Sequence, residues 1–149
     1  MVRGADLPFK GTILTQDLRN DHKEIANICN LFIHGNFDVD EFIDQMNYII
    51  NYHFKIEENI LFNESKNYLD DVPRYNEMVL LLKNEHENIK RYLEKYRKYK
   101  NKEFLKDMAN VLLNHIYKEE NGIYNILDEH VPDDAKEIIY EKIKNFLDY

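Results

Sequence analysis

Two short stretches of the chain contain residues that could bind a metal ion. They read HFKIEE at 53–58 and HIYKEE at 115–120, and each places a His four residues before a Glu. Four residues are a little over one helical turn, so each His and its Glu lie on the same helix face. Imidazole and carboxylate groups inside a helical bundle suit iron or manganese and, less selectively, zinc.

The apolar spacing around both stretches turns these side chains toward a protein core. The first face comprises Met46, Ile49, Ile50, His53, Glu57, Ile60 and Leu61, and the second comprises Leu112, His115, Glu119, Ile123 and Ile126. A core-facing Glu is costly unless it is paired, protonated or bound to a cation. Arg and Lys are absent from these two faces, so the pattern favours a bound cation.

Two further His occupy the middle of apolar helical stripes, His22 in the first predicted helix and His86 in the third. With His53 and His115 they are spaced nearly evenly along the chain. In antiparallel helices joined by short turns, such spacing places all four at a similar depth. The predicted metal ligands are therefore His22, His53, Glu57, His86, His115 and Glu119. Two Glu shared between two ions would give each ion two His and leave open positions on both.

A metal-free structural or interaction bundle is the alternative interpretation. A single buried His is usually a hydrogen-bonded structural residue, and polar pairs four residues apart are common on helices. Four His at one depth with two inward Glu are different, because the carboxylates would then need another partner.

Several neighbouring residues have two possible roles. The acidic residues Glu58, Glu85 and Glu120 either orient the imidazoles from behind or lie on solvated helix faces, and Glu120 could replace Glu119 as ligand. We expect Tyr48, Tyr52, Tyr117 and Tyr124 to fill the core, with hydrogen bonding to a metal-bound oxygen as the alternative.

Hydrophobic periodicity predicts an all-α fold, an up-down-up-down four-helix bundle followed by a short fifth C-terminal helix. The predicted helices span 12–33, 38–63, 73–99, 102–128 and about 133–147. Gly35 signals the end of the first helix. The helix-start signals are Asp38 with Glu41 for the second helix, Pro73 for the third and Asn101 for the fourth. We expect one domain over 1–149, with an extended arm at 1–11, the bundle at 12–128 and the C-terminal helix at 129–149.

Composition narrows the class of protein. The chain has 149 residues and a net charge of −8, with no long basic run, which argues against binding of nucleic acid or an anionic membrane. No apolar segment approaches a membrane span, and the first residues lack the apolar run of a signal peptide. Cys29 is the only cysteine, so an internal disulfide is excluded. We expect a soluble, cytoplasmic protein.

The pattern His22, His53-x-x-x-Glu57, Glu85-His86, His115-x-x-x-Glu119 resembles the diiron site of the hemerythrin-like family. The resemblance covers most of the chain. It implies a four-helix bundle that holds two iron ions with bridging carboxylates and an oxo or hydroxo bridge; manganese or zinc are the possible substitutes. It also implies that the protein binds dioxygen, peroxide or nitric oxide, with an electron donor that the sequence does not identify.

One departure from the family pattern bears on function. The oxygen-carrying hemerythrins have a fifth His on the third helix, whereas Leu82 and Lys90 stand four residues before and after His86. The remaining four His and two Glu are similar to the diiron domain of proteins that repair damaged iron–sulfur centres. The sequence thus favours a non-haem diiron protein, with oxidase- or peroxidase-like turnover undecided. A sensor of oxygen, iron or nitric oxide, or an iron-handling module, is the alternative.

Overall fold

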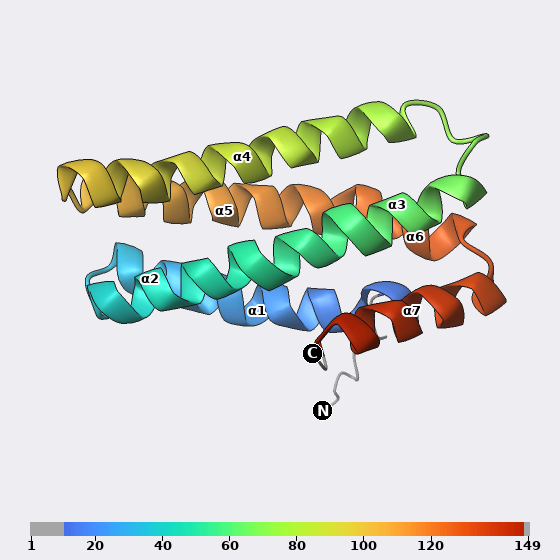
Figure 1. The fold of residues 1–149 in the computed structure, drawn as a ribbon, viewed down its shortest axis with the longest axis horizontal. Helices are drawn as coiled ribbons and strands as arrows, with labels where there is room; N and C mark the ends of the chain where they lie inside the picture. Colours follow the sequence, from blue (N-terminus) through green and yellow to red (C-terminus); the bar gives the residue numbers. More distant parts are fainter. Residues whose placement is uncertain (1–10, 148–149) are drawn as a thin grey trace.

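The computed structural model describes residues 11–147, and within that range every regular element is helical. The elements are α1 (Ile13–Ile33), α2 (Val39–Tyr48), η1 (Ile49–His53), η2 (Ile56–Leu61), α3 (Phe62–Ser65), η3 (Lys66–Tyr68), α4 (Tyr75–Tyr99), α5 (Glu103–Asn121), α6 (Ile123–His130) and α7 (Asp133–Leu147). The elements form four long rods: α1, the segment from α2 to α3, α4, and α5 with α6. The rods alternate in direction, and α7 lies beside α1 (Figure 1). The prediction of an all-α bundle with a short C-terminal helix is confirmed. The predicted arm lies almost wholly outside the described residues.

Local signals for the first connection are confirmed. At the end of α1, Gly35 has a φ of +80°, and the N–H of Asn36 donates to the carbonyl of Leu31 at 2.8 Å. This is the helix-ending arrangement that a glycine permits at no steric cost. The carboxylate of Asp38 then accepts a hydrogen bond from the N–H of Glu41 at 3.0 Å and caps the start of α2.

The second rod is less regular than the predicted α-helix at 38–63. It contains two π-helical segments, η1 and η2, in which backbone N–H groups bond to carbonyls five residues back: Phe54 to Ile49 and Phe62 to Glu57. A π turn holds more residues than an α turn, so it rotates the following side chains about the axis. As a result Phe54, Ile56 and Phe62 are buried, while the predicted core residues Ile50 and Ile60 are only partly buried.

The prediction of one continuous fourth helix over 102–128 was wrong. The helix breaks at Gly122, which separates α5 from α6. A Cβ at this position would lie 2.8 Å from the carbonyl oxygen of Lys118, so glycine allows a close backbone approach there. The break places Ile123, Tyr124 and Leu127 in the core, and Ile126 is only partly buried.

The predicted starts of two helices also need correction. The third helix begins at Tyr75 rather than at Pro73, because Arg74 takes a left-handed conformation with a φ of +67°. On the C-terminal helix α7, Ile139 and Ile143 are buried, whereas Ile138 is 59% exposed. The N-cap of α5 is Lys102 rather than the predicted Asn101, although the Asn101 side chain accepts a hydrogen bond from the N–H of Glu103 at 3.0 Å.

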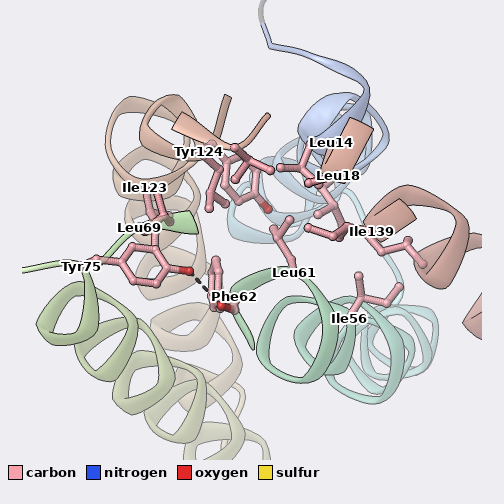
Figure 2. Close-up of a cluster of buried hydrophobic side chains, with 14 of the residues drawn as sticks. Leu14, Leu18, Ile56, Leu61, Phe62, Leu69, Tyr75, Ile123, Tyr124 and Ile139 are labelled. Atoms are coloured by element: carbon pink, nitrogen blue, oxygen red, sulfur yellow. Dashed lines mark hydrogen bonds between the residues drawn. The ribbon is translucent and has the colours of Figure 1, made fainter. Parts of the chain in front are cut away.

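Two apolar clusters fill the interior. The first joins α7 and α6 to α1, η2 and α3, and includes Leu14, Leu18, Ile56, Leu61, Phe62, Leu69, Tyr75, Ile123, Tyr124 and Ile139, all labelled in Figure 2. The second lies toward the α1–α2 connection and includes Phe32, Phe42, Met46, Phe54, Leu105 and Met108. Tyr124 of the first cluster stacks on His22, and Phe54 of the second stacks on His86. The His-containing layer therefore contacts apolar packing on both sides. Among the helices described, none is long and apolar enough to cross a membrane.

Candidate metal centre

The six side chains predicted as ligands converge in the bundle core. They form two groups of possible metal donors, His22, His53, Glu57 and Glu119 in one and Glu57, His86, His115 and Glu119 in the other. Within each group the donor atoms all lie within 4.8 Å of one another. Both carboxylates belong to both groups, so the arrangement can hold two adjacent cations that share Glu57 and Glu119.

Five elements contribute these side chains. His22 comes from α1, His53 from η1, Glu57 from η2, His86 from α4, and His115 and Glu119 from α5. Each of the six is at most 4% exposed. The apolar stripe of each helix turns these polar groups inward, since the same face that packs the core carries them.

Distances between the donor atoms fit a metal ion between them. The Nε2 atoms of His22 and His53 are 3.1 Å apart, and those of His86 and His115 are 3.0 Å apart. Glu119 Oε1 lies 3.3 Å from His22 Nε2, and Glu119 Oε2 lies 3.3 Å from His115 Nε2. Two donors that each lie about 2.1 Å from one ion are separated by roughly 3.0–3.4 Å.

Carboxylates hold three of the imidazoles from behind. The Nδ1–H of His22 donates to Glu120 at 2.8 Å. That of His86 donates to Glu58 at 2.7 Å, and that of His115 donates to Glu85 at 2.7 Å. A carboxylate can only accept, so these contacts assign the proton to Nδ1 and leave the Nε2 lone pairs for the centre. Of the two roles considered for Glu58, Glu85 and Glu120, orientation of the imidazoles is the one the structure supports.

Buried oxygen atoms without hydrogen-bond donors also fit a cation. Among the described residues, Glu57 Oε1 and both carboxylate oxygens of Glu119 are fully buried and accept no hydrogen bond. Unpaired buried carboxylate oxygens are strongly unfavourable unless positive charge compensates them. Imidazole nitrogens and unpaired carboxylate oxygens therefore face one another. Together they form a set of donor atoms that can bind a metal ion.

Protons supply that positive charge when no cation is bound. Burial by itself lowers the pKa of His22, but the nearby carboxylates of Glu119 and Glu120 outweigh it and raise the pKa to about 9. Burial likewise opposes protonation of His115, and the charge of Glu119 raises its pKa to about 10. Metal ions must then compete with protons for these imidazoles.

The structure distinguishes Glu119 from Glu120, which the sequence left as alternative ligands. Glu119 is fully buried among the donor atoms, whereas the Glu120 side chain is 31% exposed and contacts His22 from behind.

Of the four tyrosines expected in the core, only Tyr124 is there, and its hydroxyl donates to Glu57 Oε2 at 2.6 Å. The expectation was wrong for the others, since Tyr48, Tyr52 and Tyr117 are 56%, 39% and 68% exposed.

Two charged residues near the centre were missed by sequence reasoning. Asp21 Oδ2 lies 3.5 Å from His53 Nδ1. Asp21 precedes His22 in the sequence, and this position did not indicate a contact with His53. Arg19 is buried, lies 5.4 Å from the centre of the Tyr124 ring, and pairs with Asp128 at 3.2 Å. That partner is more than a hundred residues away in sequence, so no local spacing could have identified it.

Comparisons with known proteins agree with the geometry. No curated protein and no solved structure matched the chain significantly. The family model described as the hemerythrin HHE cation binding domain matches residues 14–127, which include all six donor residues and most of the chain. With the two donor groups, this match implies a metal centre. The chain therefore belongs to the hemerythrin family of HHE cation-binding domains.

Proposed function

We propose that His22, His53, Glu57, His86, His115 and Glu119 bind two iron ions, and that the protein binds dioxygen, peroxide or nitric oxide there. The observation that carries this proposal is the sharing of both carboxylates by the two donor groups. Shared carboxylates hold two cations close together, and four imidazoles with two carboxylates leave ligand positions free on each. Manganese and zinc could bind to the same ligands, so an experiment has to distinguish iron from these two metals.

The chain's own residues prepare the site for such a pair. Glu58, Glu85 and Glu120 fix three imidazoles through Nδ1, which raises the basicity of the donor nitrogen. The rings of Tyr124 and Phe54 stack on His22 and His86 and cover these two imidazoles. When bound, the two ions would supply redox chemistry and open positions for a small ligand. The prediction that residues 1–149 form one domain stays a prediction.

Metal analysis together with absorption spectroscopy tests this function. Protein purified from iron-replete cells should contain two iron ions per chain, and its oxidised form should show near-ultraviolet absorption that changes with azide or peroxide. Protein that takes up only zinc under these conditions, with no redox activity, would contradict the proposal.

A sensor or iron-handling role is the second candidate, and one observation favours it. The six donor residues come from all four long rods of the bundle, so occupancy of the centre is coupled to the packing of the whole fold. Hydrogen exchange of the metal-free, reduced and oxidised proteins tests this role. Identical protection in the three states would count against it.

A further inference from the structure

The two donor groups differ in how firmly their imidazoles are held. In the group of His86 and His115, both Nδ1 atoms donate to carboxylates at 2.7 Å. In the other group His22 is held in the same way, but the Nδ1 of His53 has no hydrogen-bond partner among the described residues. Its nearest carboxylate, Asp21, remains 3.5 Å away, and that side chain is 54% exposed.

A small cavity reaches the same imidazole from the surface. It lies between α1 and the start of the second rod, has a volume of about 60 Å³, and its lining includes Asp21, Glu24 and His53. One water needs only about 10–15 Å³ of such space, so a partly hydrated cation fits. His53 is itself 4% exposed, so a buried, unpartnered ring nitrogen adjoins a cavity with two acidic side chains.

The cavity beside the other group, as far as the described residues line it, does not reach its imidazoles. A larger cavity of about 360 Å³ lies against α3 and α4 and includes Glu58 in its lining, but none of the six donor residues. Glu58 uses its carboxylate to hold His86, which is fully buried. Access from that side would require breaking a charge-assisted hydrogen bond, whereas His53 can turn toward its cavity without breaking one at Nδ1.

We infer that the His22–His53 group holds an exchangeable divalent cation, and that the cavity bearing Asp21 and Glu24 is the route by which cations enter and leave. The inference rests on the proposed function only in needing two bound cations. It does not depend on their being iron. The acidic side chains attract the hydrated ion, and His53 accepts it as water is lost. The His86–His115 group then retains its ion longer.

Release of Co²⁺ to an excess of chelator tests the inference, because this ion is air-stable and its absorption reports coordination. Protein loaded with two Co²⁺ per chain should lose them in two phases that differ by about tenfold or more, the range that outer carboxylates contribute to metal affinity. His53→Ala should retain one ion, released slowly, and His86→Ala should retain one, released quickly.

Charge variants test the route. Glu24→Gln should slow Co²⁺ uptake about twofold or more at low salt, lose this difference at high salt, and still bind two ions. Asp44→Asn is the matched control, since Asp44 is an exposed acidic residue on α2 outside the cavity lining. Asp21→Glu brings a carboxylate closer to His53 and should slow the fast phase of release.

The outcomes separate the two proposals. Fewer than two ions bound by the unmodified chain would overturn the proposed function and this inference together. Two ions lost in a single phase, or equal effects of Glu24→Gln and Asp44→Asn on uptake, would overturn the inference and leave the two-cation site standing. If His53→Ala does not fold, the uptake kinetics of Glu24→Gln still decide the matter.

Discussion

The hydroxyl of Tyr124 donates a hydrogen bond to Oε2 of Glu57 at 2.6 Å, in the core beside the ring of His22. Burial, together with the charges of the nearby carboxylates, raises the pKa of Tyr124 far above its ordinary value, so the hydroxyl stays protonated as a donor. Glu57 Oε1 faces the imidazole of His86 at 3.2 Å instead. Glu57 thus offers one oxygen to the centre, whereas Glu119 offers one to each donor group.

We expect Tyr124→Phe to destabilise the metal-free protein by about 1–3 kcal/mol, because it leaves a buried carboxylate oxygen without its donor. Bound cations would neutralise the charge of the Glu57 carboxylate as a whole, so the loss should be smaller in the loaded protein. Tyr75→Phe is the control, since its hydroxyl donates to the carbonyl of Phe62 outside the centre. Thermal unfolding with and without metal measures both. Equal losses in the two states of Tyr124→Phe would contradict this account.

Replacing Glu57 or Glu119 with Ala should abolish binding of both ions, because each carboxylate belongs to both donor groups. Replacing one His should remove mainly the ion that it binds. Glu120→Ala should keep both ions and weaken binding by about 10–100-fold, as expected for a residue that orients a ligand. Metal titration with stoichiometry measures these effects. Equal partial losses from all six donor substitutions would indicate two independent sites.

Removal of metal by a chelator should lower the melting temperature by about 5 °C or more. Metal present at one hundred times its dissociation constant stabilises the fold by about 2.7 kcal/mol, and a protein of this size shifts by roughly 2–4 °C per kcal/mol. Without cations, buried carboxylates and imidazoles must be compensated by protons alone. Differential scanning calorimetry of the two forms checks this. An unchanged melting temperature would refute it.

Leu82→His should slow oxidation of the reduced, iron-loaded protein in air. Leu82 is 5% exposed and one turn before His86, so a fifth imidazole there could fill an open ligand position. Lys90→His is the control, because the Lys90 side chain is 35% exposed and pairs with Glu87. Stopped-flow absorption after mixing with oxygen measures the rates. A stable, reversible oxygen complex in the unmodified protein would instead favour an oxygen carrier.

Gly122→Ala should destabilise the fold by about 1–3 kcal/mol, because the new Cβ would meet the carbonyl oxygen of Lys118 at 2.8 Å. It should also disturb Tyr124, which follows the break at this residue. Gly35→Ala is the comparison: nothing lies within 4 Å of its Cβ position, so only the positive φ opposes it, at about 1 kcal/mol. Chemical denaturation compares the two. A smaller effect at Gly122 than at Gly35 would argue against a tight turn.

Local spacing was enough to predict an all-α bundle and the six polar side chains that meet in its core. A His four residues before a Glu on an apolar stripe determines that both side chains point into the core together, since helix geometry alone relates them. The same holds for the helix ends at Gly35 and Asp38, whose signals act within a few residues. The all-α bundle and the convergence of six polar side chains follow from these local relationships.

Tertiary structure decided which atoms meet. The two π turns change the rotation of the second rod, and the break at Gly122 turns Tyr124 toward Glu57. The roles of Glu58, Glu85 and Glu120 depend on partners on other rods, and Asp21 stops 3.5 Å short of His53. Such contacts depend on the rotation and depth of packed helices, which residue spacing within one helix does not specify.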